Sequence, residues 1–221
     1  MKKISISFLL LSFVLLFCGY AFQWKLSSNV KTMIKYAKKN NAEKSIQFFQ
    51  NFTDNEYKEF EKYLDKHPGD LPPIYFIIMA DKVFEHDKEK AIFYFSFGKL
   101  RATEDVLMCE DKTARGQLGI YPMLAEKTIL YHSTLKDIQL DIRVMQKTLD
   151  WDDKYTNRVS PIWACYHGTQ IFVDGNEPKL ISTKNFQEQK ESVREIIKNS
   201  IDARRNNPNF YSDINNEHSG K

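Results

Sequence analysis

The residues best suited to chemistry lie in two short segments of the second half of the chain. The first is Asp150-Trp151-Asp152-Asp153, and the second runs from Cys165 through His167 to Gly168. Carboxylates near a histidine can bind a hard cation or carry out acid–base catalysis. Asp152, Asp153 and His167 are therefore the candidate catalytic residues. The alternative is structural, because aspartates that close a helix and open a loop commonly make local turns.

Cys165 is a second kind of candidate, a nucleophile that needs a neighbouring base. Cys165 and His167 are two residues apart, so on a helix their side chains point to different faces. A nucleophilic pair would then need a histidine from elsewhere in the chain, such as His132. The alternative is a cysteine in the core and a hydrogen-bonded histidine.

The motifs of the common enzyme classes are missing from the sequence. It has no C-x-x-C, H-E-x-x-H or G-x-S-x-G pattern and no glycine-rich phosphate loop. The 16 Phe and 11 Tyr residues fall mainly at helix-core spacing without basic residues between them, which argues against stacking on nucleic-acid bases. We therefore expect no cofactor, no metal ion and no nucleic-acid partner.

The N-terminus predicts export. Lys2 and Lys3 precede an apolar run over residues 4–17, and small residues occupy positions 19 and 21. This arrangement is typical of a secretory signal peptide over residues 1–21, cleaved after Ala21. The expected location is the periplasm.

Two other interpretations of this segment stay open. Residues 4–22 are just long enough for a membrane anchor, which needs about 17–25 residues. The protein would then face the periplasm from the inner membrane and touch the membrane only through this segment. Lipoprotein processing at Cys18 is the third interpretation, disfavoured by the bulky Phe17 before it.

Charge and cysteine content constrain the rest of the chain. The net charge is +3, from 32 basic and 29 acidic residues, and falls to about +1 without residues 1–21. A near-neutral chain has no global attraction to nucleic acid or anionic lipid. Cys109 and Cys165 remain as a disulfide candidate, since exported proteins can keep such bonds. The bond would contribute about 3–4 kcal/mol by constraining the unfolded chain; the alternative is two separate buried thiols.

The apolar spacing predicts one helix after another. The fold class expected is all-α, an irregular helical array built around a central αα-hairpin, with a single domain over residues 22–205 and a disordered polar tail over 206–221. Thr53 and Glu56 form a capping box, and Pro72-Pro73 opens the hairpin. Helices are expected over residues 28–39, 54–66, 72–105 (the hairpin), 118–131, 135–149 and 183–205, with polar connectors at 110–117 and 150–159.

The hairpin carries a family resemblance. Asp87-Lys88-Glu89-Lys90-Ala91, followed by Phe93-Tyr94-Phe95, resembles the D-x-x-K-A-x-x-W/F-Y core of Sel1-like repeats, relatives of the tetratricopeptide repeat. The resemblance covers residues 72–105 and implies two packed helices used in protein–protein contact. The glycines of the family's first helix are missing and no second copy follows, so a solitary αα unit is expected.

A wider resemblance joins three features: the hairpin over 72–102, the Trp151-Asp152 pair and the segment from Trp163 to Gly168. Together they resemble a group of small exported bacterial helical proteins without an assigned activity. This second resemblance implies domain boundaries rather than chemistry.

Three functional hypotheses follow. The leading one is a non-enzymatic protein that binds another protein of the bacterial envelope, such as an immunity or inhibitor protein that neutralises a secreted toxin. The second is an envelope hydrolase or metal-dependent enzyme that uses Asp152, Asp153 and His167. The third is a structural envelope factor tethered by an uncleaved N-terminus.

Overall fold

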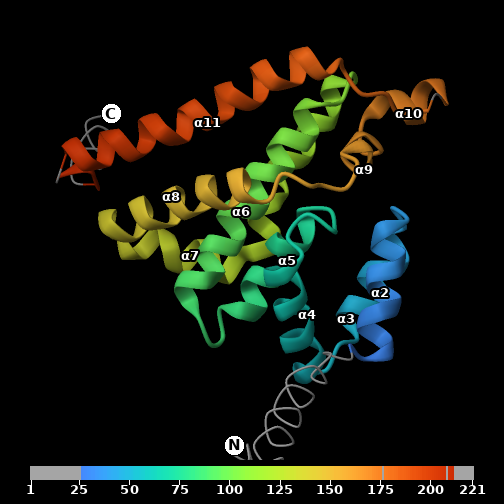
Figure 1. The fold of residues 1–221 in the computed structure, drawn as a ribbon, viewed down its shortest axis with the longest axis horizontal. Coiled ribbons are helices and arrows are strands. Elements are labelled where there is room, and N and C mark those ends of the chain that lie inside the picture. Colours follow the sequence, from blue (N-terminus) through green and yellow to red (C-terminus); the bar gives the residue numbers. More distant parts are fainter. Residues whose placement is uncertain (1–25, 176, 208, 212–221) are drawn as a thin grey trace, which may run out of the picture.

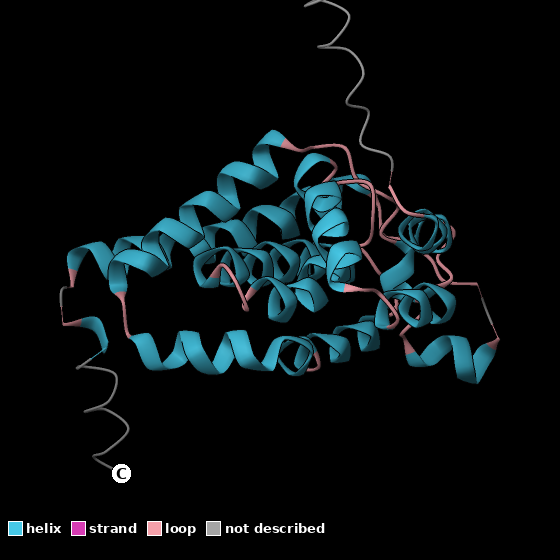
Figure 2. Ribbon diagram, turned by 90° about the horizontal axis from the view of Figure 1, so that it is seen from below, coloured by secondary structure: helices cyan, strands magenta, loops and turns pink. Residues whose placement is uncertain are grey.

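The computed structural model describes residues 26–175, 177–207 and 209–211. Within these ranges the secondary structure is helical and contains no strand, which confirms the all-α prediction (Figures 1 and 2). None of the helices in the described ranges is long and apolar enough to cross a membrane. The predicted signal peptide or anchor, residues 1–21, and most of the predicted tail lie outside the described residues.

Of the three N-terminal helices, the first and the third begin where the sequence predicts, because local capping fixes their starts. The three helices are α2 (Ser28–Lys38), α3 (Ala42–Gln50) and α4 (Asp54–Lys66). Thr53 and Glu56 form the predicted capping box at the start of α4. Val30, Met33, Ile34 and Ala37 form the buried face of α2.

The predicted hairpin is present and lies at the centre of the molecule (Figure 1). It consists of α5 (Ile74–Val83) and α6 (Lys88–Leu107), and Asp87 caps the second helix. Gly98 of α6 lies so close to α5 that an added Cβ would be 2.8 Å from Cγ1 of Ile77. Glycine is therefore required for this helix–helix approach.

The middle of the chain departs from the prediction. The 3₁₀ segment η1 (Lys112–Gly119) occupies most of the connector expected over 110–117. The single helix expected over 118–131 is divided into the 3₁₀ segment η2 (Tyr121–Ala125) and the helix α7 (Glu126–Leu135). Gly116, Gly119 and Pro122 interrupt the α-helical pattern there. Lys136 has a left-handed backbone (φ 47°), which separates α7 from α8.

Helix α8 (Ile138–Lys154) continues five residues past the predicted end at Leu149. The connector predicted over 150–159 therefore begins only after Lys154, and Asp150, Asp152 and Asp153 are helical instead of forming turns. Three cations contact Asp152 on this last turn, so tertiary ion pairing outweighs the local turn preference of aspartate.

The C-terminal third crosses back over the hairpin. Two short helices, α9 (Ile162–Cys165) and α10 (Thr169–Asp174), lead to the long helix α11 (Thr183–Asn206), which runs across α6 and α8 (Figure 1). Residues 209–211, part of the predicted disordered tail, return toward α8, where the Tyr211 hydroxyl donates to Asp141.

Apolar side chains from most of these elements form one large core around the hairpin, and Leu100, Leu149 and Ile201 form a smaller one beneath α11. Cys109 and Cys165 are disulfide-bonded, with their Cα atoms 5.3 Å apart, which confirms the predicted bond. The disulfide joins the end of α6 to α9, and an adjacent antiparallel bridge pairs Cys109 with Leu180. These links hold the start of the C-terminal third against the hairpin.

Candidate functional site

Asp152, the first candidate catalytic residue, is buried and fully engaged by cations. Its carboxylate accepts from Arg101 Nε at 3.0 Å and from Arg194 Nη1 at 2.7 Å. Lys190 Nζ lies 2.9 Å from its Oδ2 atom. Asp152 is only 1% exposed, so these contacts occupy both oxygens and leave no face for a substrate. Its role in the structure is to join α6, α8 and α11.

Two further buried carboxylates, Glu104 and Asp105 of α6, lie near Asp152 of α8. Arg158 Nη2 donates to Asp105 Oδ1 at 2.6 Å, and Arg158 Nη1 donates to Glu104. Trp163 Nε1 donates to the other oxygen of Asp105 at 2.8 Å. We call this set the ionic cluster: Arg101, Glu104, Asp105, Asp152, Arg158, Lys190 and Arg194.

The environment of the ionic cluster moves the pKa values of its carboxyls in opposite directions. Burial raises the pKa of Glu104 to about 7, although Arg158 opposes this. Burial also raises the pKa of Asp105. For Asp152, burial acts in the same direction, but hydrogen bonding and attraction from Lys190, with the charge of Arg101, hold its pKa below the usual value. Glu104 Oε1 is buried and has no hydrogen-bond partner among the described residues.

Asp153 and His167 do not join Asp152 in a common site. The Asp153 side chain is exposed on the outer face of α8, where Arg194 Nη2 lies 2.7 Å away. His167 packs against Trp163, with ring centroids 6.4 Å apart, and lines a small groove of about 110 Å³ beside α5 and the α2–α3 pair. Burial lowers the pKa of His167. Among the described residues, no group of three or more His, Cys, Asp or Glu is placed to hold a metal ion.

The proposed cysteine–histidine pair is also not formed. Cys165 is bonded to Cys109, so its sulfur is not a free nucleophile. His132 Nε2 instead lies 2.6 Å from Asp141 Oδ1. Asp141 also accepts from Arg204 and Tyr211, which secures the end of α11 and the following residues against α8. This histidine therefore has a structural contact of its own.

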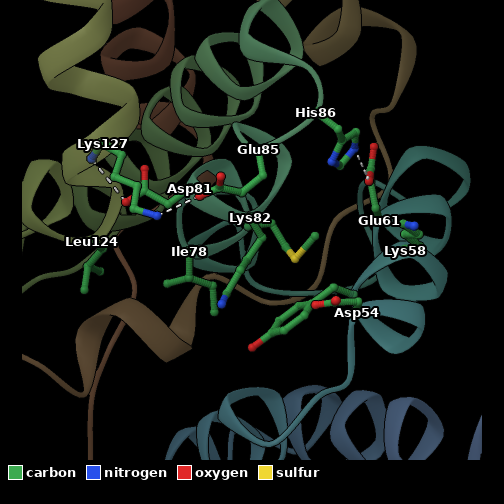
Figure 3. Close-up of a pocket in the computed structure, with 12 residues that line it drawn as sticks. Asp54, Lys58, Glu61, Ile78, Asp81, Lys82, Glu85, His86, Leu124 and Lys127 are labelled. Atoms are coloured by element: carbon green, nitrogen blue, oxygen red, sulfur yellow. Dashed lines mark hydrogen bonds and ion pairs between the residues drawn. The ribbon is translucent and has the colours of Figure 1, made fainter.

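A wider hollow than the groove beside His167 lies over the outer face of α5 (Figure 3). Helix α4 forms one wall of this hollow, and η2 with the start of α7 forms the other; its volume is about 680 Å³. We call it the α5 groove. It is lined by Asp54, Tyr57, Lys58 and Glu61 of α4, by Ile78, Met79, Asp81, Lys82, Glu85 and His86 of α5 and its end, and by Leu124 and Lys127.

The acidic side chains of the α5 groove mostly have partners within the fold. Glu61 contacts Lys90 at 2.6 Å and His86 at 3.0 Å, and Glu85 contacts Lys127 at 2.7 Å. Asp81 accepts from the backbone amide of Thr128 at 2.9 Å and so caps the start of α7. These carboxylates hold the walls of the groove in place.

Two lysines of the α5 groove differ from these carboxylates. Lys58 and Lys82 are exposed, and neither is in salt-bridge contact with a carboxylate of the described chain, although Lys127 and, less strongly, Lys82 lower the pKa of Glu85. Lys82 Nζ lies 4.5 Å from the centroid of the Tyr57 ring, a cation–π contact that leaves its N–H donors available. The groove therefore combines an apolar floor with unpaired positive charge.

Neither the ionic cluster nor the α5 groove was predicted from the sequence, and only the ionic cluster has a recognisable signal there. Arg101, Glu104 and Asp105 interrupt a helix whose other residues are largely apolar, and charges in such a helix indicate buried pairing. The α5 groove has no comparable signal, because its residues come from three separate elements.

Comparisons with protein-family models, curated proteins and solved structures found no match for this chain.

Proposed function

We propose that this protein is an exported, non-enzymatic binding protein that holds a segment of another envelope protein in the α5 groove. An immunity or inhibitor protein that neutralises a secreted toxin would be one protein of this kind. The observation that carries the proposal is the groove itself, whose apolar floor and unpaired lysines lie open while the candidate catalytic residues are dispersed or engaged in ion pairs.

The floor and one lip of the groove offer apolar surface. Half-buried Ile78 and Leu124, which is 38% exposed, line it with accessible side chains, whereas Met79 in the floor is only 1% exposed. Next to Leu124, Met123 is 74% exposed and Ile120 is 53% exposed. Apolar side chains gathered at a groove between helices are the usual receptor for the apolar face of an amphipathic helix. Burial of this surface would supply the affinity.

The charges of the groove favour an acidic partner segment. Glu61, Asp81 and Glu85 of the groove walls are engaged by neighbouring groups, and Asp54 at the start of α4 is the exposed exception; Lys58 and Lys82 keep free donors. A carboxylate of the partner can therefore pair with either lysine without displacing a contact within the fold. The expected ligand is a helix with apolar residues on one face and Glu or Asp beside them.

Export is part of the proposal and has separate support. The N-terminal sequence has the pattern of a signal peptide, and the Cys109–Cys165 disulfide is typical of oxidising compartments. The disulfide also braces α6, the helix that packs against the groove-forming α5.

A peptide selection tests the proposal without knowledge of the partner. Random 16-residue peptides displayed on phage are selected on the disulfide-bonded protein, and the enriched peptides are assayed by fluorescence anisotropy. We expect acidic peptides with apolar residues at helical spacing, whose binding falls at least about tenfold in the K58E/K82E variant.

The matched control is K31E/K35E, which makes the same charge change on exposed lysines of α2 and should leave peptide binding unchanged. Enrichment of basic peptides, or binding that K58E/K82E leaves intact, would contradict the proposed ligand. Failure to select any binder that competes at the groove would count against the binding function itself.

A further inference from the structure

We propose that α2 docks on an anionic phospholipid surface through four lysines on its exposed face, Lys31, Lys35, Lys38 and Lys39. This inference does not depend on the α5 groove. It concerns a different part of the molecule and a different partner. We call this surface the α2 lysine face.

The chain has an uneven charge distribution that its near-neutral total conceals. Residues 26–51, which contain α2 and α3, hold five lysines and one glutamate, a net charge of +4. Residues 52–221 hold 24 basic and 28 acidic residues, a net charge of −4. The α2–α3 pair is therefore the positive pole of the protein, and such asymmetry points to an anionic partner surface.

The fold turns these lysines outward as one surface. They are spaced i, i+4, i+7 and i+8, which places them on one side of a helix, and all four are exposed. The opposite side of α2 is anchored in the core by Val30, Met33, Ile34 and Ala37. Since α2 contains no acidic residue, its exposed face is positive along its whole length.

Most of this positive charge is uncompensated. Lys38 pairs with Asp70 at 2.8 Å, an exposed contact that anionic lipid can replace. Lys31, Lys35 and Lys39 form no ion pair with a carboxylate of the described chain. Three flexible ammonium groups therefore remain available for phosphate oxygens.

The position of α2 in the chain favours a membrane over an acidic protein. The candidate membrane segment over residues 4–22 contains the apolar run, and only the five residues 23–27 lie between it and the start of α2 at Ser28. Five residues span at most about 18 Å, even when fully extended. When the apolar run enters a bilayer, during export or as a retained anchor, α2 is held within reach of the lipid headgroups.

The expected affinity gain is large enough to measure. One lysine near an anionic bilayer contributes about 1 kcal/mol, or roughly fivefold in partition coefficient, at moderate salt. Reversing two of the four lysines should therefore lower binding to anionic vesicles by at least about 20-fold.

The test compares vesicles of 30% phosphatidylglycerol in phosphatidylcholine with vesicles of phosphatidylcholine alone. The protein is expressed from the full sequence and purified with the N-terminus that remains after processing in the cell. It is mixed with each kind of vesicle, and its partition is measured by flotation. The apolar run contributes equally to both compositions, so the ratio of the two partition coefficients reports the lysines. We expect a high ratio for wild type that falls at least about 20-fold in K31E/K35E.

Two controls isolate the effect. K58E/K82E, with the same charge change in the α5 groove, should keep the wild-type ratio. K31Q/K35Q removes the positive charges without adding negative ones and should give an intermediate ratio, and circular dichroism verifies that each variant folds. In 0.5 M salt, where the screening length is roughly 4 Å, the wild-type preference should disappear.

A wild-type protein that partitions equally onto both vesicles would overturn the proposal, and so would a K31E/K35E variant with an unchanged ratio. Lysine-dependent binding of a poly-glutamate peptide without binding to anionic vesicles would identify an acidic protein as the partner instead. Because K58E/K82E and K31E/K35E separate the α5 groove from the α2 lysine face in both assays, failure of one proposal is distinguishable from failure of the other.

Discussion

Replacing Glu104 with glutamine should remove a pH-dependent loss of stability from the wild-type protein. The Glu104 side chain is fully buried on α6, and burial raises its pKa from 4.5 to about 7. Between these two pH values the folded protein keeps a proton on Glu104 that the unfolded chain releases. The free energy of unfolding therefore decreases as the pH rises through this interval.

The size of the effect follows from the two pKa values. Each pKa unit corresponds to about 1.36 kcal/mol, so a rise from 4.5 to about 7 amounts to about 3 kcal/mol. This contribution is fully present below pH 4.5 and is lost above pH 7. Glutamine has nearly the shape of protonated glutamate and does not titrate, so E104Q keeps its stability over the same range.

The groups around Glu104 determine how strongly its ionised form is stabilised. Arg158 donates to one oxygen from the segment after α8, and Lys190 approaches the same oxygen from α11 at 3.8 Å. Asp152 of α8 opposes ionisation, and Oε1 has no partner among the described residues. Arg101 of α6 also interacts with Glu104 electrostatically. One unpaired buried oxygen and a nearby carboxylate therefore offset much of the attraction from the cations.

Urea unfolding measured by circular dichroism at pH 5, 6, 7 and 8, with the disulfide intact, tests this reasoning. The difference in unfolding free energy between E104Q and wild type should increase by about 2–3 kcal/mol from pH 5 to pH 8, because part of the wild-type contribution is already lost at pH 5. Other titrating groups, such as Asp141 with its lowered pKa, are shared by both proteins and cancel in the difference. E188Q, an exposed substitution on α11, is the matched control. A difference for E104Q that stays constant with pH would refute the assignment.

Two further predictions concern the disulfide and the candidate catalytic aspartates. Replacing Cys109 and Cys165 together with alanine should lower the free energy of unfolding by about 4 kcal/mol, because the bond closes a loop with a sequence separation of 56. Thermal unfolding with and without reductant measures this loss. A double variant as stable as the oxidised protein would contradict the prediction. Asp152→Ala should cost about 3–5 kcal/mol in urea unfolding, since it leaves three cations without their shared carboxylate. Asp153→Ala, on the exposed face, should cost less than about 1 kcal/mol, and equal losses for the two variants would be inconsistent with a buried ionic cluster.

The sequence by itself determined where several helices begin. Thr53 with Glu56, Asp87 and Ser182 accept hydrogen bonds from backbone amides within three residues, so the signal for each start is local. The apolar spacing likewise determined which face of α2 is buried, because helical periodicity is a property of the chain itself. The hairpin and its turn followed from the same kind of local information.

The sequence also limited the cysteine chemistry without deciding it. Two cysteines in a chain with an export signal left a disulfide and two buried thiols as alternatives. The packing of α9 against the end of α6 decided for the bond, because it brings the two Cα atoms to 5.3 Å.

Only the tertiary structure determined which contacts the candidate catalytic residues make. Asp152 was predicted as a turn or a catalytic carboxylate, but its partners Arg101 and Arg194 are 51 and 42 residues away in sequence. Which charges meet at such distances depends on how α6, α8 and α11 cross, and no local pattern encodes that crossing. The same reason applies to the α5 groove, whose walls become neighbours only when α4 and α7 pack on opposite sides of α5.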